Sequence, residues 1–216
     1  MGLLKDVLKI ILWIAVFLGI LVAVGRFTIW EPGEAPDNAM APNIWKGDKF
    51  IILTRGTVER GSVVYCHHPV YNGQVVIGRV VGLPGDTLEI IDGQLKINGD
   101  DVFSEWDKNP MTVLDRESSI NVITARFRKG SQNINGRDFN IMMAEGGTPP
   151  QLAQTEVKSG YFLLGDNRSL AFGASDSRNY GEVHPSLCMG RVFIIWKASK
   201  GWGDADLSLR IFKPIL

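Results

Sequence analysis

The sequence predicts a mainly β protein that carries one N-terminal transmembrane helix. Residues 10–25 contain no charged side chain, and this is the sharpest shift of composition in the chain. From residue 45 onward, short apolar runs of strand length alternate with turn residues. No segment after residue 40 has the periodicity of a long amphipathic helix. We therefore expect a folded sheet or barrel-like body with a β-rich insertion, held behind the helix.

The uncharged segment is slightly too short to cross a bilayer by itself. Sixteen helical residues cover roughly 24 Å at 1.5 Å per residue, against a hydrocarbon core of ~30 Å. Lys9 and Arg26 can extend their charges to the two interfaces, and Trp30 suits the headgroup level. We predict a transmembrane anchor over residues 7–30, preceded by a cytoplasmic tail of residues 1–6.

A cleavable signal peptide is the alternative for this segment. It is disfavoured because residues 22–25, Val-Ala-Val-Gly, match a small-x-small cleavage site poorly. Lys5 and Lys9 precede the segment, whereas Glu31 and Glu34 follow it. This charge bias predicts a single-pass protein of the cell membrane with its N-terminus inside and a periplasmic or extracellular ectodomain.

The chain after the anchor divides into a core and an insertion. Residues 31–36 contain two prolines and a glycine, so we expect an extended linker. The predicted strands are 50–53, 63–66, 75–77 with 80–81, 88–90, 95–97, 161–164 and 192–196. Asp92-Gly93 predicts a hairpin turn, and Asn98-Gly99 a second turn. We assign residues 31–102 and 160–216 to the core, and the polar, turn-rich residues 103–159 to a variable β-rich insertion.

The bulk composition excludes several classes of ligand. Lys and Arg balance Asp and Glu at 23 each, so no field points to nucleic acid. The sequence has no metal-ligand spacing and no phosphate loop, and we expect neither a metal nor a cofactor. Cys66 and Cys188 could pair in an oxidising compartment, but two cysteines make no disulfide framework. Both lie in hydrophobic stretches, and we expect two buried thiols rather than a bridge.

Four motifs stand in order behind the anchor. They are Pro-Asp-Asn-Ala-Met-Ala-Pro at 36–42, Gly-Arg-Val-Val-Gly-Leu-Pro-Gly-Asp at 78–86, Gly-Asp-Asn-Arg at 165–168 and Asp-Ser-Arg at 176–178. With the anchor, this order resembles the type I signal peptidases, Ser/Lys proteases that remove leader peptides at the outer face of the bacterial membrane. The resemblance covers nearly the whole chain, and it implies the fold of that family.

The reactive side chains of that family are missing at the matching positions. The nucleophile position holds Ala39, and the general-base position holds Gly78. Asp37 stands where a serine hydroxyl helps to hold the oxyanion, so an ionised carboxylate would repel the developing charge. Ala174 replaces the serine that orients the lysine. Because a Ser/Lys site needs its nucleophile, its amine and its oxyanion donors, the resemblance implies an inactive relative.

Two alternatives would make the natural protein an active peptidase. A laboratory substitution of serine explains Ala39 but leaves Asp37, Gly78 and Ala174 unexplained. Other side chains could act instead; the candidates are Cys66, His67, His68, Ser175 and Ser177. We interpret the histidines as a turn after a strand and Cys66 as a buried strand residue. Asp176 and Arg178 are expected to form a structural ion pair around Ser177.

A peptide-binding groove needs none of the missing groups. The family binds leaders as extended strands, and main-chain pairing requires no catalytic residue. We assign Met40, Pro42, Arg79 and Gly82 to the groove. Trp45 and the region of Trp202 are candidates for an apolar surface against membrane lipid.

The resulting hypothesis is a catalytically inactive, membrane-anchored protein of the signal peptidase type. It would bind an extended peptide or a partner subunit during protein export or assembly of a surface structure, as a chaperone or accessory protein. In lacking the dyad, the chain resembles the signal-peptidase-like proteins found beside pilus assembly systems in some bacteria. One rival is a signal peptidase inactivated by substitution or using non-standard residues. The other is a purely structural subunit of a larger membrane complex.

Overall fold

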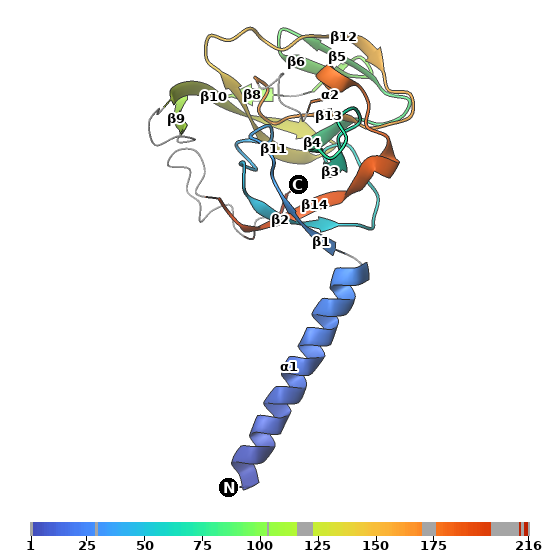
Figure 1. The fold of residues 1–216 in the computed structure, drawn as a ribbon. Coiled ribbons are helices and arrows are strands. Elements are labelled where there is room, and N and C mark those ends of the chain that lie inside the picture. The colour runs from blue at the N-terminus through green and yellow to red at the C-terminus, as the bar shows by residue number, and fades with distance from the viewer. Residues whose placement is uncertain are drawn as a thin grey trace.

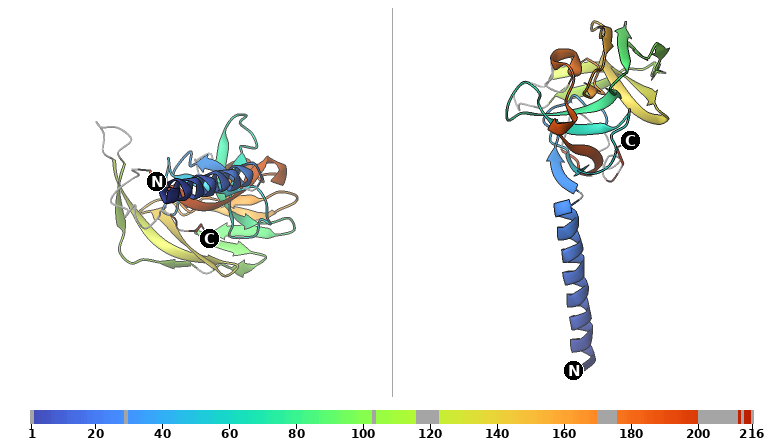
Figure 2. Two further views of the ribbon diagram at one scale, coloured as in Figure 1. Left: turned by 90° about the horizontal axis from the view of Figure 1, so that it is seen from below. Right: turned by 90° about the vertical axis from the view of Figure 1, so that its right-hand side faces the viewer.

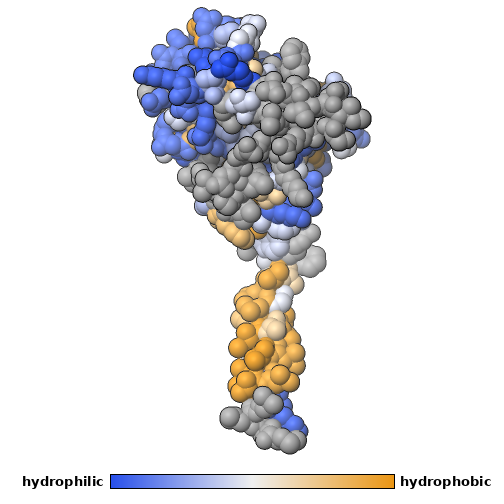
Figure 3. Space-filling view, turned by 90° about the vertical axis from the view of Figure 1, so that its left-hand side faces the viewer, coloured by the Kyte–Doolittle hydropathy of each residue, from blue (hydrophilic) through white to orange (hydrophobic). Residues whose placement is uncertain are grey.

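A long helix stands apart from a β-rich body (Figures 1 and 2). The computed structural model describes residues 2–28, 30–102, 104–115, 123–169, 176–199, 212 and 214–215. Helix α1 spans Gly2–Thr28, and its segment Lys5–Gly25 is long and apolar enough to cross a membrane. None of this segment is buried inside the body, and its side chains form the apolar column of Figure 3. The predicted combination of one apolar N-terminal helix with a mainly β body is confirmed.

A six-stranded antiparallel sheet lies at the end of the body nearest the helix (Figure 1). Its order is β1 (Trp30–Glu34), β2 (Lys49–Leu53), β14 (Cys188–Lys197), β3 (Val63–His67), β4 (Val75–Gly82) and β13 (Phe162–Leu164). The expected linker at 31–36 is therefore not free, because its first part pairs with β2 as an edge strand. Pro32 is tolerated there because an edge strand leaves one row of backbone groups unpaired. Trp30 belongs to this strand rather than to the helix.

Two further sheets complete the body. The first contains β12 (Leu152–Glu156), β5 (Thr87–Ile91), β6 (Gln94–Ile97) and β7 (Asp100–Asp101). The second contains β8 (Ser104–Trp106), β9 (Met111–Asp115), β10 (Ile123–Ile134) and β11 (Arg137–Ala144). Both predicted turns are present, since Asp92 and Asn98 take positive φ values before glycines. After residue 40, the described helical elements are only the short α2 (Ser177–Tyr180) and the 3₁₀ turn Pro185–Leu187.

Residues 103–159 share their core with the rest of the body. Ile134, Phe139 and Ile141 pack in one cluster with Val81 of β4 and Leu88 of β5. Strand β12 comes from the same stretch but pairs with β5 in the neighbouring sheet. Burial of apolar surface contributes about 25 cal/mol per Å². The packing of β10 and β11 in this cluster therefore stabilises β4 directly.

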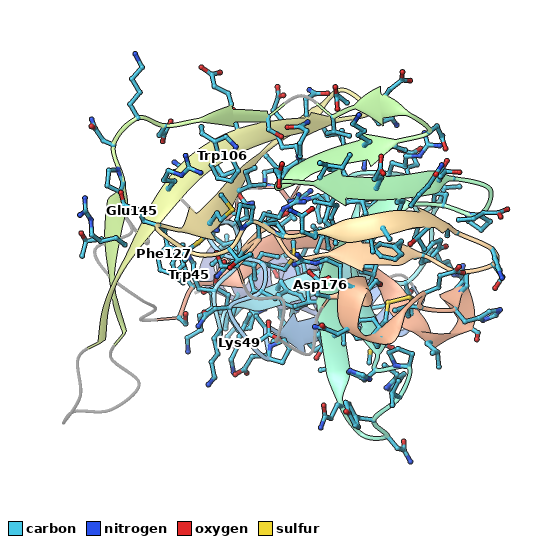
Figure 4. All side chains as sticks on the ribbon, turned by 90° about the horizontal axis from the view of Figure 1, so that it is seen from above. Trp45, Lys49, Trp106, Phe127, Glu145 and Asp176 are labelled. Carbon is cyan, nitrogen blue, oxygen red and sulfur yellow. A yellow bond between two sulfur atoms is a disulfide. The ribbon has the colours of Figure 1, made fainter. Side chains whose placement is uncertain are left out.

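The two cysteines form a disulfide, which corrects the expectation of two thiols. Cys66 of β3 and Cys188 of β14 are register partners with Cα atoms 3.8 Å apart, although 122 residues separate them in sequence. Figure 4 draws the disulfide as a yellow bond between two sulfur atoms. The prediction was wrong because two separate hydrophobic stretches gave no sign that their strands would be neighbours. Only the strand order places the two sulfur atoms together.

Candidate functional site

The connection between β1 and β2, residues 35–48, carries the first motif. Its start and end are joined where the Ala35 N–H donates to the Asp48 carbonyl at 2.9 Å. Inside it, the N–H of Ile44 donates to the carbonyl of Met40 at 2.9 Å. Ala39 lies in this turn with 1% of its surface exposed. The position predicted for a nucleophile is thus buried and held by backbone hydrogen bonds.

Asp37 is hydrogen-bonded to the backbone of Ala39. Its Oδ1 atom accepts the N–H of Ala39 at 2.9 Å, which closes an Asx turn across two residues. In serine hydrolases, backbone N–H groups beside the nucleophile are typical oxyanion donors. Here the corresponding N–H already faces a carboxylate. The site therefore holds an anionic side chain of its own at the place where an oxyanion would need a donor.

Strand β4 carries Gly78 and Arg79 side by side. Gly78 is buried and pairs with Val64 of β3. The alternation of a strand places it on the same face as Val76 and Val80, which pack with Val64, Leu163 and the ring of Tyr180. The position that the resemblance assigns to a general base therefore lies on an apolar face of the sheet and supplies no proton acceptor.

The segment 165–168 connects the first motif to β4. The N–H of Asn167 donates to the Ala39 carbonyl at 2.8 Å. A Cβ atom on Gly165 would lie 2.6 Å from that same carbonyl oxygen, so the close approach requires glycine. Asp166 receives Arg79 in a bidentate ion pair, with Nε–Oδ1 and Nη2–Oδ2 distances of 2.8 Å. Asn43 adds a bond to the Asp166 Oδ2 atom at 2.7 Å.

The last motif, residues 176–178, lies at the start of α2. Asp176 caps the N-terminus of α2 and pairs with Arg178, with an Nε–Oδ1 distance of 2.8 Å and an Nη2–Oδ2 distance of 2.7 Å. Arg178 also donates to the carbonyl of Arg168 at 3.3 Å. Ala174, the expected lysine-orienting position, lies outside the described residues.

The four groove candidates differ in exposure. Met40 is fully buried in the core, Arg79 is 1% exposed, and Gly82 is buried. A Cβ atom on Gly82 would come within 2.7 Å of Leu88. Pro42 is half-buried, like Asp37. In this conformation Asp37 and Pro42 are accessible to solvent, whereas the other three groove candidates are buried and do not present a surface to a ligand.

Trp45 does not form a membrane surface, as the sequence had suggested that it could. It is 1% exposed, and its Nε1 donates to the carbonyl of Pro42 at 3.1 Å. It packs with Ala41, Phe127 and Met142, and Figure 4 shows it beside Phe127. The backbone N–H of Trp45 donates to the Asp48 carboxylate at 2.9 Å, and this bond helps to hold Trp45 inward. Trp202 lies outside the described residues.

Three of the five side chains considered as rescuing groups are engaged elsewhere. Ser177 is buried, and its Oγ accepts the N–H of Leu163 at 2.9 Å. His68 Nδ1 accepts the N–H groups of Val70 and Tyr71 in the turn after β3, and burial lowers its pKa. Cys66 is in the disulfide. His67 is exposed, and Ser175 lies outside the described residues.

Tyr180 is a site residue that the sequence did not single out. Its ring meets His68 edge-on, with centroids 4.9 Å apart. Burial, followed by the charge of Asp176, raises the pKa of Tyr180, and Asp37 adds to the rise. Tyr180 therefore stays protonated. The sequence gives no signal of these surroundings, because they depend on tertiary packing.

Comparison with known proteins identifies the family. The signal peptidase, peptidase S26, family matches residues 6–197.

The chain belongs to this signal peptidase family.

It is 27% identical to signal peptidase IB of Staphylococcus aureus (strain COL) over 202 residues, covering 91% of this chain and 93% of that protein. It is 26% identical to signal peptidase I of Buchnera aphidicola subsp. Schizaphis graminum (strain Sg) over 226 residues, covering 82% of this chain and 70% of that protein. The resemblance read from the four motifs is thereby confirmed. No group of three or more His, Cys, Asp or Glu side chains suited to a metal occurs among the described residues.

Proposed function

We propose that this chain is a signal peptidase relative without peptidase activity, which binds an extended peptide or a partner subunit at the outer face of the membrane. One observation carries the proposal: Ala39 and Gly78 occupy the positions of the dyad, and the Asp37 carboxylate is bonded to the Ala39 N–H at 2.9 Å. A methyl group cannot attack a carbonyl carbon, and a glycine cannot accept its proton.

The oxyanion position argues in the same direction. Stabilisation of the tetrahedral intermediate by one donor contributes about 10²–10³ in rate in serine proteases. In this chain the nearby acceptor is a fixed carboxylate, so an oxyanion would meet like charge. Replacing the nucleophile alone would therefore restore only one of several missing contributions, and such contributions act as a unit.

The hydrogen bonds that hold the motifs together support a binding role. The bonds that join Ala39 to Asn167 and Arg79 to Asp166 keep the motifs in one rigid arrangement without any reactive group. Extended peptides bind such folds through main-chain pairing and a few side-chain pockets. Asp37, half-exposed at the rim, adds a negative charge that favours a polar or basic ligand side chain.

The disulfide supports an ectodomain outside the cytoplasm. Disulfides persist in oxidising compartments and are rare where thiols are kept reduced. Cys66 and Cys188 lie after α1, on the side away from Lys5 and Lys9. An anchored single-pass protein with its N-terminus inside and the body in the periplasm or outside the cell satisfies both the disulfide and the charge bias.

The test uses the purified full chain in a mild neutral detergent. A fluorescent leader peptide is incubated with the protein, and cleavage is followed by mass spectrometry while binding is followed by fluorescence anisotropy. We expect saturable binding without cleavage. Asp37→Lys should weaken binding about tenfold or more, whereas Asp138→Lys, the same change at an exposed position of β11, should not.

The outcomes separate the three functions. Cleavage above that of a heat-inactivated sample supports an active peptidase and contradicts the proposal. Neither binding nor cleavage, together with a native mass larger than that of one chain, supports a purely structural subunit. Equal loss of binding in Asp37→Lys and Asp138→Lys would place the peptide elsewhere on the body.

A further inference from the structure

The buried charges behind the site do not balance. Three guanidinium groups and two carboxylates meet there: Arg79, Arg168, Arg178, Asp166 and Asp176. Arg79 and both aspartates are at most 1% exposed, Arg168 is 5% exposed, and the Arg178 side chain is 7% exposed. Within the described part of the chain, this cluster therefore carries one excess positive charge.

The excess charge belongs to Arg168. Both oxygens of Asp166 are bonded to Arg79, and both oxygens of Asp176 are bonded to Arg178. Each carboxylate also accepts one more bond, from Asn43 and from the backbone of Arg178. Each of the two anions thus accepts three hydrogen bonds from other donors, and within the described part of the chain neither is hydrogen-bonded to Arg168.

The Arg168 guanidinium is only partly satisfied. Its Nη2 donates to the Gln132 Oε1 at 2.5 Å, and that acceptor is a neutral amide. Its Nε atom is buried and has no hydrogen-bond partner. A buried cation without a paired anion is strongly unfavourable, because it loses its hydration and gains no equivalent interaction. Consistent with this, burial lowers the pKa of Arg168 to about 10.

We propose that Arg168 binds a small monovalent anion, either chloride or a carboxylate group, through its Nε atom. The anion would neutralise the cluster and satisfy the one orphaned donor. Its size is limited because only 5% of Arg168 is exposed, so the residue meets solvent over a small area. The site lies behind Ala39, since the segment that carries Arg168 is bonded to Ala39 through Asn167. It is independent of whether the chain cleaves or binds peptides.

The test replaces the anion with a side chain. Gln132→Glu puts a carboxylate at the atom that already accepts from Arg168, and the Ser104 hydroxyl can donate to it in place of accepting from the amide. Gln154→Glu is the matched control, since it makes the same change at an exposed residue of β12. Thermal unfolding of the full chain in neutral detergent is measured at constant ionic strength as isethionate, a monovalent sulfonate, is replaced by chloride or by acetate.

The wild type and Gln154→Glu should gain about 3–5 °C in Tm at 200 mM of the bound anion, if half-saturation lies at roughly 20 mM. Gln132→Glu should start at a higher Tm in isethionate and show less than a third of that gain. A gain in chloride alone assigns a halide, and a gain in acetate as well assigns carboxylates. An equal response of all three proteins, or no anion-dependent gain in the wild type, overturns the proposal.

A second measurement covers the case in which Gln132→Glu fails to fold. The quadrupolar NMR line of chloride should broaden in proportion to the folded wild type and narrow when bromide competes or when the protein is unfolded. The line should broaden less where acetate competes, if the site also takes carboxylates. A line that the folded protein leaves unbroadened, together with no effect of acetate on Tm, contradicts the anion site.

Discussion

The Asp37 carboxylate accepts the backbone N–H of Ala39 at 2.9 Å. The motif resemblance assigns these two residues to the oxyanion and nucleophile positions of the signal peptidase family, and here they are hydrogen-bonded to each other. The loss of the serine and the gain of the aspartate therefore act on the same backbone group. Under the proposed function, this arrangement would disfavour an oxyanion at the site while leaving the surrounding fold unchanged.

Restoring the nucleophile alone should not restore activity. Ala39→Ser adds a hydroxyl, but Gly78 supplies no base and Asp37 still faces the Ala39 N–H. We expect that Ala39→Ser, like the wild type, does not cleave a leader peptide, as measured by mass spectrometry. Cleavage that appears in Ala39→Ser and disappears in Ala39→Val would show that another group acts as the base.

Breaking the buried ion pair should destabilise the body strongly. Arg79→Met leaves Asp166 buried without its counter-charge, which should cost about 3–5 kcal/mol in the free energy of unfolding. Denaturant unfolding followed by tryptophan fluorescence measures this loss. Arg126→Met is the control, because Arg126 is 61% exposed and its pair with Glu145 should contribute at most about 1 kcal/mol. Equal losses in the two variants would contradict the assignment.

Removal of the disulfide should lower stability without changing the strand order. The bond closes a loop of 122 residues, and such cross-links typically contribute about 2–4 kcal/mol. The double variant Cys66→Ala, Cys188→Ala should therefore lose about 5–15 °C in Tm. A reducing agent should lower the Tm of the wild type and leave that of the double variant unchanged. If it has no effect on the wild type, the thiols are not bridged.

The orientation of the body can be tested in intact cells. Gln154→Cys introduces a thiol at an exposed position of β12, while Cys66 and Cys188 are bridged. A membrane-impermeant thiol reagent should label residue 154 in spheroplasts, because the body is predicted to lie outside. Asp6→Cys, before the apolar segment, should react only after lysis. The reverse pattern of labelling would invert the topology.

Stability should fall as the pH is lowered through the range in which His68 titrates. Burial lowers its pKa from the usual 6.5, so the unfolded chain binds a proton at His68 more readily than the folded chain. The contribution is therefore fully present above pH 6.5 and is lost as the pH falls toward the lower folded value. Protonation of Nδ1 also removes the acceptor of two backbone N–H groups.

His68→Gln should flatten this part of the pH dependence between about pH 7 and pH 5. The measurement is the free energy of unfolding from urea titrations across that range. His184→Gln is the control, because His184 is an exposed histidine in the 3₁₀ turn. If the wild type and His68→Gln keep parallel profiles, His68 does not couple to folding.

The sequence by itself determined the features that depend on local pattern. An uncharged run at 10–25 can only be an apolar helix or a signal segment, and α1 covers it. Apolar runs bounded by turn residues located most strands of the core, and Asp92-Gly93 located a hairpin, because period and turn chemistry are properties of neighbouring residues. The four motifs identified the family, and they predict that its reactive side chains are missing at the matching positions.

Only the tertiary structure decided which distant residues meet. Cys66 reaches Cys188 because β3 pairs with β14, and Arg79 reaches Asp166 because β4 lies beside β13. The extended stretch at 31–34 became a strand because β2 offered it a free edge, and Trp45 turned inward because the bonds of its turn hold it there. Sequence periodicity carries no information on such pairings. They arise when long loops close and register places one strand against another, and the unbalanced charge of Arg168 is visible only once that has happened.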